Sequence, residues 1–130
     1  MSYSPSDTLI ETIDKFINEK VYKKRELDKI ETVLRNGLVS ELHKNKDITI
    51  QTLNSNKCKD IIGRALVDTM IKIKMKKLTA YNVFKKFFFF LNSNYDVRLN
   101  IEDFLKKPLE DKKERQIDIL KQLHAKPMTN

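Results

Sequence analysis

Few side chains in this sequence are of the types that perform catalysis or bind metals. His43 and His124 stand apart, and neither has a cysteine or another histidine at the short spacing typical of zinc ligands. Cys58 lies between Lys57 and Lys59, whose charges would lower the pKa of a thiol and make it nucleophilic. A partly buried lone thiol is the simpler interpretation of this residue. Because it is the only cysteine, the chain cannot form an internal disulfide, which favours a reducing, intracellular compartment.

Two pairs of neighbouring carboxylates, Glu102-Asp103 and Glu110-Asp111, are the remaining candidates for acid–base chemistry. Adjacent residues on a helix point in different directions, so each pair is better interpreted as acids near a helix start. With only Gly37 and Gly63, the chain has no glycine-rich phosphate loop. The sequence therefore predicts a protein that is not an enzyme, with no catalytic residues, no metal site and no cofactor.

Positive charge is concentrated in one stretch of the sequence. The 130 residues carry a net charge of +8, yet residues 1–56 are neutral and residues 92–130 carry only +1. Residues 57–91 hold nine Lys or Arg against two Asp, a net of +7. Such a concentration attracts phosphates through counterion release, and so predicts binding to a polyanion. Lysines that only keep the protein soluble, or that pair with an acidic partner, are the alternative interpretation.

Four consecutive phenylalanines, Phe87 to Phe90, would cover every side of a helix. The helix must therefore be enclosed, and enclosure by the chain's own core is the favoured interpretation. If the core does not suffice, a partner helix or a second copy of the chain would cover the rest. The predicted partner interface is Phe84, Phe87, Phe88 and Leu91. An interaction module that docks a protein partner through the helix at 79–92 is accordingly the alternative function.

The spacing of apolar residues predicts an all-α fold, a compact bundle of five to six helices in one domain over 1–130. The neutral segment, residues 1–56, holds a first helix capped by Ser6 or Asp7 and a second helix over 24–43. The basic segment, residues 57–91, holds a third helix capped by Asn54 or Ser55 and most of a fourth over 79–92, capped by Thr79. The last segment, residues 92–130, holds a short helix, from a cap at Asn100 to Lys107, and a final helix that begins at Pro108. Alternating residues leave open a short two-stranded β element that pairs 47–52 with 71–77.

No stretch of the sequence is long and apolar enough for a membrane span. The longest apolar run is Phe87 to Leu91, whereas a spanning helix needs about 20 such residues. The first seven residues are polar and hold no apolar signal core. We therefore expect a soluble, intracellular protein with no membrane partner, with the nucleus or another site of genome handling favoured.

The segment Lys76-Lys77-Leu78-Thr79-Ala80-Tyr81-Asn82-Val83-Phe84 resembles the opening of HMG boxes. Residues 101–105 and 109–113 resemble the end of that family's second helix and the turn after it, so that the resemblance covers 75–124. It implies contact with the DNA minor groove, with Thr79 at a base edge or sugar, Tyr81 supporting or stacking, and Asn82 at the wedge position. The same string is similar to the second loop and third helix of histone folds. Either resemblance implies that the segment from Lys72 to Lys86 faces nucleic acid.

The charge and the resemblances together predict a nucleic-acid-binding protein, with DNA favoured. Lysine dominates over arginine, so contacts to the phosphate backbone are expected to outweigh base readout. The predicted nucleic-acid-binding residues are Lys72, Lys74, Lys76, Lys77, Thr79, Tyr81, Asn82, Lys85 and Lys86.

Overall fold

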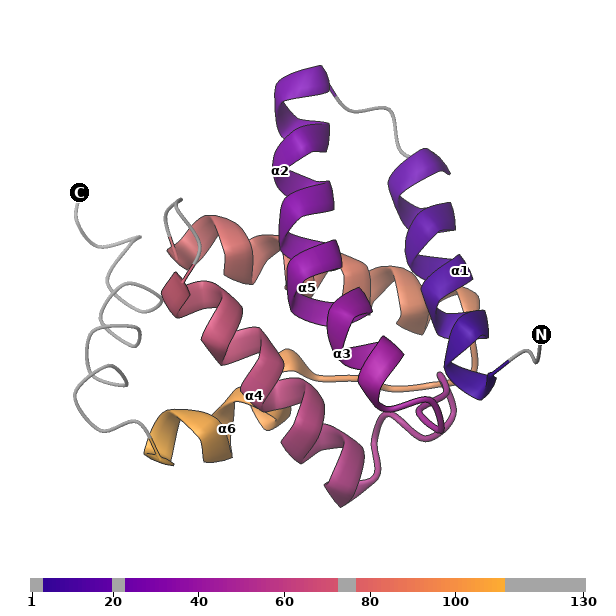
Figure 1. Ribbon diagram of the computed structural model, residues 1–130, viewed down its shortest axis with the longest axis vertical. Helices are drawn as coiled ribbons and strands as arrows, with labels where there is room; N and C mark the ends of the chain where they lie inside the picture. Colours follow the sequence, from indigo (N-terminus) through magenta and orange to yellow (C-terminus); the bar gives the residue numbers. More distant parts are fainter. Residues whose placement is uncertain (1–3, 20–22, 73–76, 112–130) are drawn as a thin grey trace.

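The computed structural model describes residues 4–19, 23–72 and 77–111, and these segments form a compact all-α fold (Figure 1). This confirms the predicted fold class. The elements are α1 (Pro5–Glu19), α2 (Lys24–Leu34), the π-helical segment η1 (Arg35–Val39), α3 (Ser40–Lys44), α4 (Asn56–Lys72), α5 (Lys77–Asn94) and α6 (Ile101–Asp111). No helix within these described segments is long and apolar enough to cross a bilayer.

The segments α2, η1 and α3 are one continuous helix from Lys24 to Lys44, close to the predicted 24–43. The backbone stays helical through the joints, and the π turn is marked by the Ser40 amide, which donates to the carbonyl oxygen of Arg35. The turn contains Gly37, which lies against α4 and α5 with no room for a side chain. A Cβ at Gly37 would lie 2.7 Å from Thr69 Oγ1 of α4 and 2.9 Å from Phe84 Cζ of α5.

No strand forms at residues 47–52, although the alternating sequence allowed a short strand there. These residues make consecutive turns, in which the Thr52 amide donates to the carbonyl oxygen of Thr49 and the two threonine side chains bond to each other. The alternation reflects burial of Ile48 and Ile50 under the helices rather than an extended backbone. The proposed pairing segment offers no strand either, because residues 71, 72 and 77 are helical and 73–76 lie outside the described residues.

The helix caps were predicted with mixed success. Ser55 directly precedes α4, and its hydroxyl accepts a hydrogen bond from the amide of Cys58 in the first turn. Asn100 directly precedes α6, and its side chain accepts a hydrogen bond from the amide of Glu102. These two predicted caps are therefore confirmed. α1 begins earlier than predicted, because Pro5 takes its first position, and α5 begins at Lys77 rather than after Thr79.

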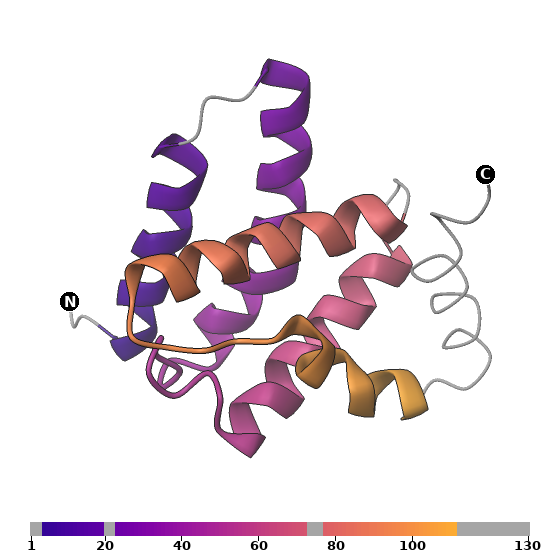
Figure 2. The ribbon, with the colours of Figure 1, turned by 180° about the vertical axis from the view of Figure 1, so that it is seen from behind.

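α5 lies against the rest of the bundle through its phenylalanines. Phe16 of α1 contacts Phe87 and Phe90, with ring centroids 5.3 and 5.2 Å apart. Phe88 contacts Phe104 of α6 edge to face at 4.8 Å. Figure 2 shows α5 crossing in front of α1 and α2, with the side that faces the viewer uncovered. The predicted enclosure of this helix by the chain's own core is therefore confirmed for three of its four consecutive phenylalanines.

α4 and α6 approach each other closely at Gly63. Pro108, predicted to start a new helix, instead lies inside α6. Its ring nitrogen carries no hydrogen, so it cannot donate to the carbonyl of Phe104 one turn earlier. That carbonyl lies against Gly63 instead: a Cβ built there would be 2.0 Å from Phe104 O. Only a residue without a side chain fits at this crossing.

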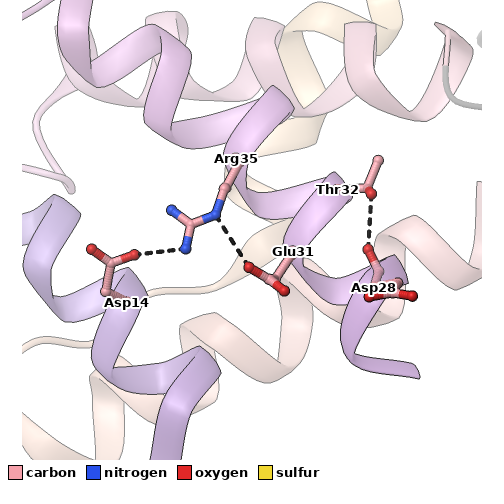
Figure 3. A network of polar contacts seen from close by, with 5 residues as sticks. All are labelled: Asp14, Asp28, Glu31, Thr32 and Arg35. Carbon is pink, nitrogen blue, oxygen red and sulfur yellow. Dashed lines mark hydrogen bonds and ion pairs between the residues drawn. The ribbon is translucent and has the colours of Figure 1, made fainter. Parts of the chain in front are cut away.

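Polar side chains hold the segment after α5 in place and connect the long helix to α1. Asn92 holds the chain after α5 through two hydrogen bonds with Leu99: its Nδ2 donates to the carbonyl oxygen at 2.9 Å, and its Oδ1 accepts from the amide at 2.7 Å. Arg35 joins the long helix to α1 through Asp14, at 2.9 Å, and also contacts Glu31 at 3.5 Å (Figure 3). Because the Arg35 pairs are partly exposed, each contributes less than about 1 kcal/mol to stability.

Candidate nucleic-acid interface

One side of α5 is exposed from Asn82 to Ser93 and forms the candidate site. We call it the outward face of α5, and it consists of Asn82, Lys85, Lys86, Phe89 and Ser93. At 3.6 residues per turn these positions fall within an arc of about 100°. All five residues are exposed, and Figure 2 shows one side of α5 that no other described element crosses. The site is therefore a convex strip rather than a pocket.

The sequence positions these side chains through the periodicity of the opposite side. Ala80, Phe84, Phe87 and Leu91 recur at helical spacing and are all buried. Their burial against the bundle fixes the rotation of α5 about its axis. That rotation leaves Phe89 pointing away from the core, because it lies nearly opposite Phe84 and Leu91 on the helix.

The charged side chains on the outward face of α5 are all positive. α5 contains three lysines and no Asp or Glu over its 18 residues. Two of these lysines, Lys85 and Lys86, are exposed on the outward face. A helix surface with cations and no carboxylate of its own attracts anionic ligands.

Phe89 is the one large hydrophobic side chain exposed among the described residues, at 72%. The other six phenylalanines of the chain are at most 8% exposed. The structure thus places a single bare aromatic ring one helical turn after two lysines.

The ammonium group of Lys85 lies over the ring of Tyr81. The Lys85 nitrogen lies 5.9 Å from the centroid of the Tyr81 ring, within range of a cation–π interaction. The Tyr81 hydroxyl donates to Glu102 Oε2 at 2.5 Å, which links α5 to α6. Burial, together with the hydrogen bond to Glu102 and its negative charge, raises the pKa of the Tyr81 phenol far above its ordinary value. Tyr81 therefore stays neutral and acts as a support.

The predicted nucleic-acid-binding residues separate into three groups. Asn82, Lys85 and Lys86 come together on the outward face of α5, and Lys72 is exposed at the end of α4. Thr79 is half-buried, and Tyr81 is buried, so its ring offers no free surface for stacking on a base. Lys74 and Lys76 lie outside the described residues, as does the side chain of Lys77.

The predicted partner interface lies inside the protein. Phe84, Phe87, Phe88 and Leu91 are at most 3% exposed, because α1, the long helix, α4 and α6 surround them. These four side chains therefore offer no surface to a partner. The exposed residue of the run is Phe89, which sequence reasoning did not single out. Its angle on the helix, opposite the apolar positions, was the signal that could have found it.

A polar groove of about 330 Å³ lies between α4 and the η1–α3 section of the long helix, away from the outward face of α5. Its charged lining residues are Glu41, Lys44, Asp68 and Lys72. Two carboxylates and two lysines give no net charge, so the groove favours neither an anion nor a cation. Elsewhere, Cys58 was interpreted as a partly buried lone thiol, and the structure places it as a free, buried thiol. No cluster of three metal-ligating side chains occurs within the described ranges.

Comparison with known proteins assigns no family. No protein-family model matches the chain, and no curated protein or solved structure shows significant similarity to it. The resemblances to HMG boxes and histone folds therefore stay predictions, and function has to be inferred from the surface itself.

Proposed function

We propose that this protein binds nucleic acid through the outward face of α5, largely without reading the base sequence. The observation that carries the proposal is the pairing of Lys85 and Lys86 on an exposed helix face that has no carboxylate. Lysine ammonium groups bind phosphate as point charges, whereas the forked geometry suited to base edges belongs to arginine. α5 contains no arginine.

The basic surface extends beyond α5 at one corner of the molecule. α4 ends at Lys72 and α5 begins at Lys77, and both figures of the whole fold show these two ends close together (Figures 1 and 2). Lys72 is exposed at this corner. A nucleic-acid backbone that runs along α5 would therefore meet a further cation as it passes α4.

The opposite end of α5 lies beside an acidic helix. α1 holds four carboxylates against Lys15 alone, a net of −3, and its Phe16 packs on Phe87 and Phe90. A polyanion is repelled from that side and attracted to the Lys85–Lys86 side. This polarity supports a ligand path toward the start of α5 and the end of α4.

The test is fluorescence anisotropy with labelled oligonucleotides at ~50 and ~200 mM salt. The variant Lys85→Glu/Lys86→Glu is compared with Lys24→Glu/Lys29→Glu, which makes the same change in net charge on exposed positions of α2. We expect the α5 variant to bind at least about tenfold more weakly, with a salt slope lower by about 2, and the α2 variant to bind nearly as wild type. Equal losses in both variants, or no binding by the wild type at the lower salt, would show that the proposal is wrong.

A docking site for a protein on the same face is the second candidate, favoured by the exposed ring of Phe89. A stable interface buries about 800 Å² on each partner, far more than one ring supplies. Light scattering over a range of concentrations tests the self-association version. A dimer that becomes monomeric in Phe89→Ser would support it.

A further inference from the structure

Phe89 has a defined set of neighbours on the helix surface. Lys85 and Lys86 lie one turn before it and Ser93 lies one turn after it, so their Cβ atoms are about 5–6 Å from its own. All four are exposed. An aromatic ring with free access is thus flanked on one side by two ammonium groups. This combination is the one that single-strand-binding surfaces use: cations for the phosphates and an aromatic ring for a base.

Resting on the proposed function, we propose that the preferred ligand is single-stranded nucleic acid and that Phe89 stacks on one of its bases. In a duplex both faces of each base are covered by its neighbours, so a ring on the surface of a helix reaches none of them without unstacking the pair. In a single strand the faces are free. Phe89 therefore gains contact area only with the single strand, whereas Lys85 and Lys86 can bind the phosphates of either a single strand or a duplex.

The surroundings of the ring favour a nucleic acid over an apolar partner. Its neighbours on the outward face are Lys85, Lys86, Asn82 and Ser93, all of them polar. A hydrophobic partner that covered Phe89 would also have to desolvate the two ammonium groups, which is costly without anions to pair with them. A nucleotide supplies the anion and the apolar base face together.

The chain has no tryptophan, so Phe89→Trp would introduce a single indole at the proposed stacking position. Stacking on a base quenches indole fluorescence, whereas burial in an apolar environment shifts its emission to the blue. The variant is titrated with an oligothymidine of about 15 nucleotides, with a duplex of the same length, and with vesicles of phosphatidylserine. We expect quenching by the single strand at concentrations well below those needed for the duplex.

Affinity measurements on Phe89→Ala and Phe89→Leu complete the test. One base–aromatic stack is worth roughly 5- to 150-fold in affinity, so both variants are expected to lose about that much for the single strand. For the duplex we expect less than about a twofold change. Leucine keeps an apolar side chain but has no aromatic face, so an effect of Leu equal to that of Ala assigns the loss to stacking. Because the Phe89 side chain is exposed, the variants are expected to unfold at the same urea concentration as the wild type.

The outcomes separate this inference from the proposed function. If Phe89→Ala and Phe89→Leu keep wild-type affinity for the single strand while Lys85→Glu/Lys86→Glu loses it, the stacking inference is overturned and the proposed function stands. If the wild type binds neither single strand nor duplex, both are overturned. A blue shift with the vesicles and no quenching by the oligothymidine would overturn the inference in favour of a lipid surface.

Discussion

Replacement of Gly63 by alanine tests the closest contact in the fold. The new Cβ would lie 2.0 Å from the carbonyl oxygen of Phe104 and 3.2 Å from Pro108 Cγ, whereas ordinary contacts begin at 3.4 Å. The main obstacle is a backbone atom, which cannot rotate away as a side chain can. α6 must therefore retreat from α4 by 1.4 Å, the difference between 3.4 and 2.0 Å.

The expected cost follows from the side chains that α6 buries. Ile101, Phe104, Leu105 and Leu109 are all buried, and burial of such side chains is worth about 2 kcal/mol each, about 8 kcal/mol together. The 1.4 Å separation is needed only at Gly63, and if α6 pivots about its far end the average gap over its buried side chains is about half of that, roughly 0.7 Å. A gap of that size loses roughly a quarter to a half of the contact energy, about 2–4 kcal/mol. Alanine returns about 1 kcal/mol through its higher helix propensity. The net destabilisation is about 1–3 kcal/mol, in the range measured for overpacked cores.

Urea and thermal unfolding followed by circular dichroism measure this cost. At roughly 4 °C per kcal/mol for a domain of this size, we expect the Tm to fall by about 4–12 °C. Gly37→Ala is the matched comparison, because its Cβ would meet the side-chain atoms Thr69 Oγ1 at 2.7 Å and Phe84 Cζ at 2.9 Å, which need smaller shifts. We expect a smaller loss there. A Gly63→Ala protein as stable as the wild type would refute the close approach of α4 and α6.

Two further predictions concern the polar contacts of α5. The raised pKa of Tyr81 means that the folded state holds its phenolic proton more tightly than the unfolded state, whose pKa is near 10.0. The stability that this supplies is complete below that pH and is lost as the pH rises above it. Urea unfolding at about pH 9 and about pH 11 should therefore show a larger loss for the wild type than for Tyr81→Phe; equal losses would contradict the buried bond to Glu102. Asn92→Ala leaves both backbone groups of Leu99 without their partner and should cost about 2 kcal/mol in the same unfolding assay, whereas a change below about 0.5 kcal/mol would show that the two hydrogen bonds do not stabilise the fold.

The helices were largely predictable, because helix periodicity is a local property. The long helix was expected over 24–43 and occupies Lys24 to Lys44, since its apolar residues recur at helical spacing. The same reasoning failed at 47–52, where alternating apolar residues sit in turns. It failed again at Pro108, because a proline inside a helix is tolerable only when the freed carbonyl has somewhere to lie, and Gly63 supplies that place from another helix.

The candidate site was only partly predicted. The concentration of lysine in 57–91 is a property of composition, and it pointed to the region that contains Lys85 and Lys86. Tyr81 was predicted to support or to stack, and its buried position and its hydrogen bond to Glu102 of a different helix were not visible in any local pattern. The importance of Phe89 was missed because the four consecutive phenylalanines look alike along the sequence.

The sequence by itself determined the approximate position of most helices among the described residues, that the phenylalanine-rich helix had to be enclosed, and that the excess charge lies in one stretch. Each of these follows from the order of residue types over a few turns. Only the tertiary structure decided which side of α5 the bundle covers, and hence that Phe89 faces outward beside Lys85 and Lys86. The rotation of a helix depends on the faces that α1, α4 and α6 present to it. Those faces come from residues far away along the chain, and no local pattern specifies how they meet.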